Sequence, residues 1–237
     1  MGISVVIPVA EGDDAWKELL PELTALSADD EIILSSKSIL KDDLEIMAED
    51  TGLLCHCFSQ PSLAGRARQL NAGAKAGTKE FYWFLHCDSR VSRKAVLRLK
   101  KSIERRPQAI HFFNLKFLKD GPLLTAINER GAWLRSRILR LPFGDQGFCM
   151  HRVTFESLGG FCEKSAYGED HLLIWKAHQR NIKLNCVGEA LGTSARRYKT
   201  QGWLKTTGIH LFLTVKQAVP EFKKVLFSKY SVARIAK

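Results

Sequence analysis

Apolar and polar residues alternate in blocks along the first half of the chain, and the blocks predict strands and helices in turn. Short apolar runs rich in β-branched and aromatic residues predict buried strands at Ile3–Val9, Glu31–Leu34, Leu53–Cys57 and Phe81–Leu85. Stretches with helical spacing follow them, at Ala15–Leu26, Asp42–Asp50, Gly65–Gly77 and Arg93–Arg105. This alternation predicts an α/β fold with a mostly parallel central sheet and helices on both faces.

The regular alternation of predicted strands and helices stops after residue 110, and no linker-like stretch marks the change. Strands are predicted at Ile110–Phe117, Gln146–His151 and Lys183–Val187, and helices at Leu123–Arg140, Tyr167–Gln179 and Trp203–Val219, with Pro220 ending the last one. We therefore expect one domain over residues 1–237. It would consist of a first half of about 1–110, a second half of about 111–215 and a C-terminal extension of 216–237.

Composition narrows the class of protein. Hydrophobic residues make up 45% of the 237 residues and charged residues 26%, which is ordinary for a globular domain. The N-terminus reads as a strand rather than a signal peptide, and the longest apolar stretches are far shorter than the roughly 20 residues of a membrane span. We expect a soluble, cytoplasmic protein. The six cysteines contain no C-x-x-C pair, which favours reduced and mostly buried thiols over a zinc site.

The net charge of +11 is concentrated at one end, since residues 195–237 hold ten Lys/Arg and one acid, a net of +9. Nucleic acid, anionic lipid, a polyanionic substrate and plain solvation all suit such a tail. No nucleic-acid-binding module is recognisable, so we expect no nucleic-acid partner. The apolar and basic stretch from Trp203 to Lys216 fits peripheral contact with a membrane, packing onto the domain, or a homodimer.

Two segments of the first half carry candidate chemistry. Asp88 follows a strand directly, where a parallel sheet places its ligands, and its carboxylate and His86 suit a divalent cation; capping of the helix that begins near Ser92 is the alternative for Asp88. The helix from Gly65 places Arg66, Arg68 and Asn71 near its N-terminus, which suits an anion. Two solvated arginines would be the simpler interpretation.

Two further segments lie in the second half. Glu169 and Asp170 begin a predicted helix, where they can cap it or act as a general base. Gly144, Asp145, Gln146 and Gly147 indicate a tight turn in which the backbone comes close to another group, or simply a loop.

Taken in order, these segments resemble the family 2 glycosyltransferases of the GT-A fold over about residues 1–215. The resemblance is strongest to a bacterial subgroup with a Gly-Arg-Ala-Arg-Gln-x-Asn-Ala-Gly-Ala helix and a Phe-Leu-His-Ala-Asp-Thr strand end; here they read GRARQLNAGA (65–74) and FLHCDS (84–89).

The resemblance implies an inverting, metal-dependent sugar transfer from a nucleotide-sugar donor held by the first half to an acceptor held by the second. It implies Mn²⁺ or Mg²⁺ at Asp88, with His86 where the first acid of the metal motif usually stands, and Asp170 or Glu169 as the base. Gly144–Gly147 would line the acceptor entrance, and the acceptors of such enzymes are often lipid-linked. The donor would contact Pro8, Val9, Glu11, Ser36, Arg66, Arg68, Asn71, His86 and Asp88.

The chain departs from the family where the nucleotide base is usually held. Ser35-Ser36-Lys37-Ser38 stands where an acid is typical, so Lys37 reverses the charge. A second hypothesis follows, in which the protein keeps the fold with weakened catalysis and binds a glycan, a lipid or another protein.

Overall fold

The computed structural model describes residues 1–37, 49, 52–60 and 63–235, with the side chains of the last helix described to residue 226. The helix expected at Asp42–Asp50 lies almost wholly outside the described residues.

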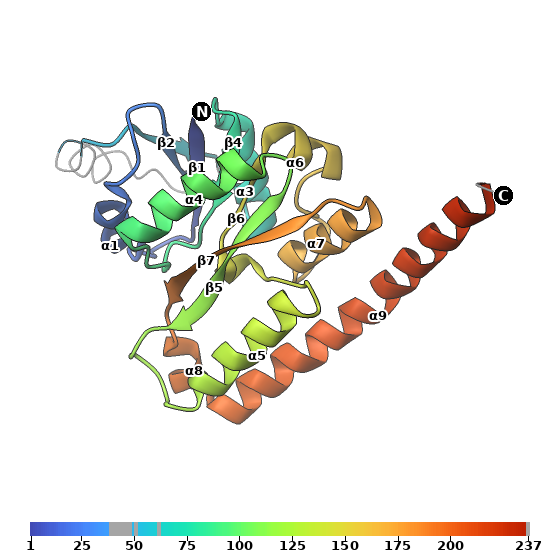
Figure 1. Ribbon diagram of the computed structural model, residues 1–237. Coiled ribbons are helices and arrows are strands. Elements are labelled where there is room, and N and C mark those ends of the chain that lie inside the picture. Colours follow the sequence, from blue (N-terminus) through green and yellow to red (C-terminus); the bar gives the residue numbers. More distant parts are fainter. Residues whose placement is uncertain (38–48, 50–51, 61–62, 236–237) are drawn as a thin grey trace.

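One seven-stranded sheet runs through the molecule (Figure 1). Its spatial order is β3 (Cys55–Ser59), β2 (Glu31–Ser36), β1 (Ile3–Val9), β4 (Phe81–Phe84), β6 (Phe148–His151), β5 (Ile110–Phe117) and β7 (Leu184–Thr193). The first four strands are mutually parallel, β6 is antiparallel to both of its neighbours, and β5 and β7 are parallel. The predicted mostly parallel α/β sheet is thus confirmed, and β6 joins the two halves of the chain into it.

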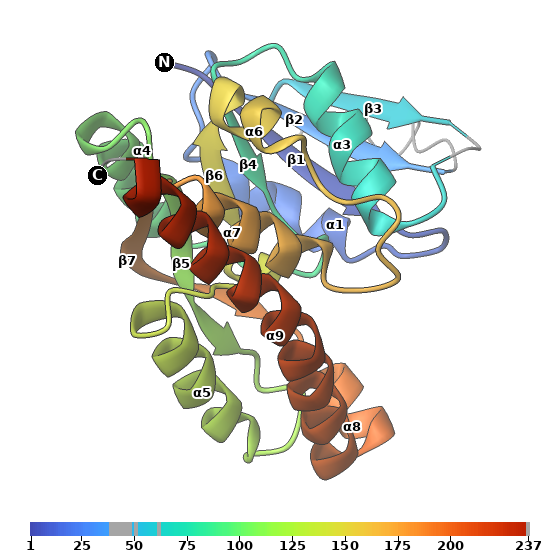
Figure 2. The same cartoon turned by 90° about the vertical axis from the view of Figure 1, so that its right-hand side faces the viewer.

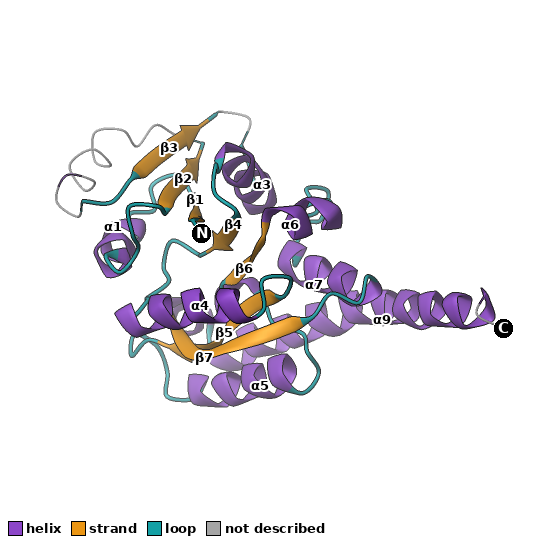
Figure 3. Cartoon of the chain, turned by 45° about the horizontal axis from the view of Figure 1, so that its top comes forward, coloured by secondary structure: helices purple, strands orange, loops and turns teal. Residues whose placement is uncertain are grey.

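Helices lie on both faces of this sheet, as Figure 3 shows, and apolar side chains pack between them and the sheet on each face. Along β1, Val5 belongs to the core under α1 (Trp16–Leu19) and α4 (Arg93–Arg105). Its neighbour Val6 belongs to the core under α3 (Arg66–Ala76), α6 (Arg152–Leu158) and α7 (Glu169–Gln179). Successive side chains of a strand point to opposite faces, so a continuous apolar run is what a sheet covered on both sides requires.

The second half adds α5 (Thr125–Arg137) against β5, the short helix η2 (Gly144–Gln146), α8 (Arg196–Gln201) and α9 (Trp203–Ile235). Figure 2 shows α9 crossing the face of α7. Among the described residues, no helix is both long enough and apolar enough to traverse a bilayer.

Several boundaries differ from the sequence prediction. Pro220 does not end the last helix, which continues to Ile235. A proline removes one backbone hydrogen bond, while Gln217 and Glu221 on either side of it are held by polar contacts to α7. The predicted helix Ala15–Leu26 is shorter, because a 3₁₀ turn (Leu20–Leu23) follows α1. Helices α6 and α8 are short and were not predicted.

Candidate active site

The carboxyl ends of β1, β2 and β4 meet at one edge of the sheet, because these strands are parallel and adjacent. Pro8 lies at the end of β1, and Asp88 follows the end of β4. Together with the N-terminus of α3 they line a pocket of about 380 Å³, which we call the strand-end pocket. This is the edge where open α/β sheets bind their ligands.

The strand-end pocket is lined by charges of both signs. Its acids are Glu11, Asp13 and Asp88, and its bases are Lys37, Arg66 and Arg196. Lys37 Nζ lies 3.7 Å from Glu11 Oε2, and Arg196 Nη2 lies 3.5 Å from Asp13 Oδ2. Loosely paired bases of this kind suit an anionic ligand, and carboxylates suit a cation that accompanies it.

Asp88 can contribute one ligand to such a cation. Burial raises the pKa of its carboxyl, and Arg196 opposes that rise. No group of three His, Cys, Asp or Glu side chains within the described ranges is arranged to hold a metal. A single carboxylate such as that of Asp88 suits an ion of the Mg²⁺ type, which takes one or two carboxylates from the protein and its other ligands from substrate phosphates and water.

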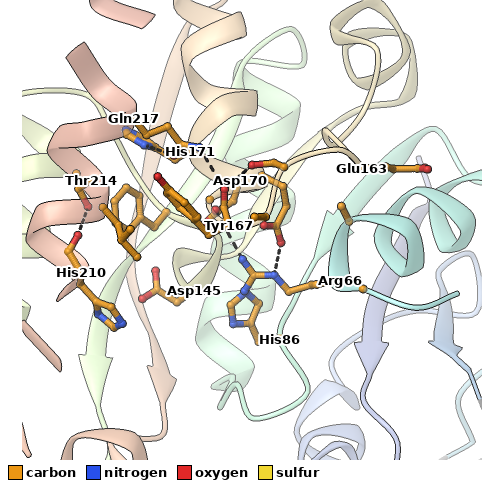
Figure 4. Close-up of a pocket in the computed structure, with 18 of the residues that line it drawn as sticks. Arg66, His86, Asp145, Glu163, Tyr167, Asp170, His171, His210, Thr214 and Gln217 are labelled. Atoms are coloured by element: carbon orange, nitrogen blue, oxygen red, sulfur yellow. Dashed lines mark hydrogen bonds and ion pairs between the residues drawn. The ribbon is translucent and has the colours of Figure 1, made fainter. Parts of the chain in front are cut away.

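A second, larger pocket of about 540 Å³ opens beside the first (Figure 4). It is lined by the start of α7, by Asp145 and by the inward side of α9. Ala64, Gly65, Arg66 and His86 line both pockets. The two cavities therefore meet at the Arg66 and His86 side chains, which we call the junction.

Arg66 is the centre of the polar contacts at the junction. Its Nε donates to Glu169 Oε1, its Nη2 lies 3.7 Å from Asp170 Oδ1, and its Nη1 lies 3.1 Å from His86 Nε2. Burial works to lower the pKa of Arg66, but Asp170 and Glu169 raise it. The guanidinium is therefore charged and links α3 to α7.

His86 is neutral at the junction. Burial, together with the nearby charge of Arg66, lowers its pKa to about 3. Arginine can only donate, so His86 Nε2 must accept and the ring proton must lie on Nδ1.

Asp170 is ionised in the same environment. Burial would raise its pKa, but Arg66 and the backbone N–H of Gly144 lower it. A Cβ at position 144 would come within 2.9 Å of Asp170 Oδ2 and 3.2 Å of Asp170 Cβ, so glycine favours this close approach of the backbone. The turn at 144–147 and the start of α7 thus form one unit.

The pKa of Asp145 is shifted in the opposite direction from that of Asp170. Burial raises its pKa to about 6, in spite of the opposing charge of Arg135. Its Oδ1 is buried and has no hydrogen-bond partner among the described residues. The Arg135 guanidinium lies 3.3 Å from the ring centroid of Phe143 instead. A carboxyl so placed can exchange a proton near neutral pH.

The other candidate residues have varied surroundings. Arg68 lines the larger pocket, where its Nε lies 3.8 Å from Glu163. Asn71 bonds both the N–H and the carbonyl of Phe161, and so fixes the loop before α7. Gln146 donates to the carbonyl of Phe113. Ser36 is fully buried at the end of β2.

Val9 and Gly147 are also parts of the framework around the pockets. The Val9 carbonyl accepts a hydrogen bond from Gln69. Gly147 has a positive φ of 59°, and a Cβ there would come within 2.5 Å of Leu191. Both positions constrain the backbone beside the site.

The sequence did not predict that α9 lines the larger pocket. Its lining residues are Ile209, His210, Leu213, Thr214 and Gln217. His171 Nδ1 lies 2.8 Å from Gln217 Oε1, while Trp175 Nε1 donates to His171 Nε2. No spacing in the sequence indicates that α9 folds back onto α7. Sequence reasoning also missed Arg196, whose place in the basic tail was the one available signal.

No protein-family model and no curated protein sequence matches the chain. Among solved structures, it is similar to the mannosyltransferase PcManGT from Pyrobaculum calidifontis in complex with GDP-Man and Mn²⁺. That match has 15% identity and a TM-score of 0.72, over 96% of this chain and 68% of that one.

The chain is also similar to S. aureus TarS, with 15% identity and a TM-score of 0.64 over 82% of this chain, and to its 1–349 fragment in complex with UDP-GlcNAc, with 16% identity and a TM-score of 0.65. It spans 37% of the length of TarS and 58% of the fragment, which is less than two thirds of either. The chain has the GT-A-like fold of nucleotide-sugar-binding glycosyltransferases.

Proposed function

We propose that the protein is an inverting, metal-dependent glycosyltransferase that moves a sugar from a nucleotide-diphosphate donor to an acceptor hydroxyl. The observation that carries the proposal is the junction, where Arg66 and His86 line both pockets. A donor in one pocket and an acceptor in the other would meet there, as a single-displacement transfer requires.

The strand-end pocket is the proposed donor site. Asp88 would hold Mn²⁺ or Mg²⁺ there, and the cation would neutralise charge on the leaving diphosphate. His86 faces Arg66, so in this proposal it orients the guanidinium beside the donor. Lys37, paired with Glu11, replaces the acid usual in the family and would favour phosphate over ribose contacts.

The larger pocket is the proposed acceptor site, with Asp170 or Glu169 as the base. The acceptor oxygen would attack the anomeric carbon and lose its proton to the carboxylate, while the bond to the diphosphate breaks on the opposite face. One displacement inverts the configuration. Asp170 is ionised, as a base must be, and Gly144 and Arg66 fix its position.

Calorimetry and turnover assays test the two sites separately. With Mn²⁺ present, the protein should bind a nucleoside diphosphate, and Asp88→Ala should abolish this binding. Asp170→Asn should keep the donor affinity and lower turnover by about 100-fold or more, the usual contribution of a general base. The exposed Asp29, changed to alanine, is the control. Absence of nucleotide binding with and without metal would overturn the proposal.

A catalytically weakened GT-A-like protein is the second candidate. The ion pair between Lys37 and Glu11 favours it, because these charges stand where the family usually contacts the nucleotide. In that case donor hydrolysis and transfer should both be undetectable, although the wild-type chain still binds a glycan, lipid or protein partner.

A further inference from the structure

Helix α9 exposes an apolar stripe along its described length. Large apolar side chains are exposed at positions that share one face of the helix, at Leu204, Leu211, Phe212, Val215, Val219, Phe222 and Leu226. The opposite side packs against the body, since Thr206 and Glu221 are buried and Gln217 bonds His171. The stripe therefore faces away from the domain.

Helix α5 and its flanks continue this surface. Exposed apolar side chains again share one side there, at Leu123, Leu124, Ile127, Leu134 and Ile138. Asn128 ties the two helices together, because it accepts from Trp203 Nε1 at 2.6 Å and donates to Thr207 at 3.1 Å. Figures 1 and 2 both show α5 and α9 on the same side of the molecule.

The concentration of apolar side chains here is unusual for a globular surface. Twelve of the nineteen exposed large hydrophobic residues in the described part of the chain belong to these two stripes. We call this surface the α5–α9 face.

Every exposed ionisable Lys, Arg, Asp or Glu side chain in the described segments 123–140 and 203–226 is positive, namely Arg130, Arg137, Arg140, Lys205, Lys216, Lys223 and Lys224. Their two acids turn inward: Glu129 accepts from the Phe117 N–H at 2.7 Å, and Glu221 accepts from Gln179 at 2.9 Å. By helical spacing, Lys205, Lys216 and Lys223 form a row along one edge of the α9 stripe, and Arg130 and Arg137 lie beside the α5 stripe.

We propose that the α5–α9 face docks in the plane of an anionic phospholipid surface. Apolar side chains would enter the boundary between headgroups and acyl chains, and the flanking cations would meet the lipid phosphates. A second copy of the chain would bring the same positive charges together, so charge complementarity favours the membrane. The docking does not depend on the proposed transferase activity.

Docking would also bear on the acceptor, a step that does rest on the proposed function. The inward side of α9 walls the larger pocket. A docked protein would hold this pocket beside the headgroups, within reach of an acceptor anchored in the same lipid layer.

Co-sedimentation of the full chain with vesicles tests the docking. Vesicles of phosphatidylcholine with about one quarter phosphatidylglycerol should bind the protein, and vesicles of phosphatidylcholine alone should bind it at least tenfold more weakly. The double variant Leu134→Gln/Phe212→Gln should lose binding at least tenfold. Leu97→Gln, an exposed leucine on α4, is the matched control and should bind as the wild type does.

Charge reversal tests the electrostatic part. Lys205→Glu/Lys216→Glu should abolish the preference for anionic vesicles, whereas Lys101→Glu on α4 should retain it. Equal binding of wild type to both kinds of vesicle would overturn the proposal. So would a dimer in light scattering that Leu134→Gln/Phe212→Gln dissociates while vesicles bind neither protein. Circular dichroism establishes that each variant is folded, and nucleotide calorimetry separates failure here from failure of the transferase.

Discussion

Two aspartates beside the junction show how their surroundings give chemically identical groups different pKa values. Asp170 and Asp145 are neighbouring carboxyls, yet the pKa of the first is lowered by Arg66 and Gly144 and that of the second is raised to about 6 by burial. Pairs of titratable groups whose environments shift their pKa values in opposite directions are typical of sites that move protons. The burial of the ionised Asp145 carboxyl therefore lowers the stability of the folded protein.

Asp145→Asn should reduce that loss of stability. The folded-state pKa lies above the ordinary value of 3.8, so the wild type loses stability as pH rises from about 4 to about 6. The variant should gain on the order of 1–3 kcal/mol in the free energy of unfolding at pH 7.5 and little near pH 3. Denaturant unfolding at both pH values measures this. A gain independent of pH would contradict the explanation, and Asp29→Asn serves as the control.

Among the elements, α3 brings Arg66 to the junction, and it packs closely against the sheet. The helix packs against β1 and β2 through a glycine, since a Cβ at Gly73 would come within 2.5 Å of Val6 and 3.4 Å of Ser35. Small residues at this contact set the distance of the helix from the sheet, and therefore the position of its first turn.

Gly73→Ala should destabilise the protein although alanine favours helices. Overpacking typically costs about 1–3 kcal/mol, which exceeds the gain of up to about 1 kcal/mol in helix propensity. Gly131→Ala in α5 is the matched comparison, because nothing lies within 4 Å of its added Cβ. That variant should be neutral or more stable. Thermal unfolding of the two variants measures the difference. Equal changes in Tm would show that α3 can shift to accommodate the added methyl group.

At the scale of the whole molecule, α9 fastens the second half of the chain. Its described polar links include contacts with Asn128 in α5, with His171 at the start of α7 and with Gln179 at the end of α7. A long helix with few buried apolar contacts depends on such links for its local stability.

Gln217→Leu should loosen α9 without unfolding the domain. The change leaves His171 Nδ1 without its partner and removes the bond to the Tyr167 carbonyl. Amide hydrogen exchange should rise in residues 203–226 and stay constant in β1 and β4. Lys216→Ala, one residue away and exposed, should leave the exchange unchanged. Faster exchange throughout the sheet would instead indicate global destabilisation.

The sequence predicts best those features whose signal is local. The strands Ile3–Val9 and Ile110–Phe117 match the structure, because a buried strand must be apolar wherever it lies. The antiparallel placement of β6, the continuation of α9 past Pro220 and the fold of α9 onto α7 depend on contacts between distant segments. Glu169 and Arg66 are singled out by motifs, but only the fold places them in contact.

The place of β6 in the sheet has a consequence for how the protein is made. Strand β4 ends just before His86 and Asp88, and one of its two edges pairs with β6, where Phe81 faces His151. The ribosome releases the chain from its N-terminus, so β4 emerges long before β6 does. Pairing of segments so distant in sequence is slow. Pulse-labelled hydrogen exchange should therefore find that the amides which join β4 to β6 gain protection late, so that the junction becomes ordered only as folding finishes.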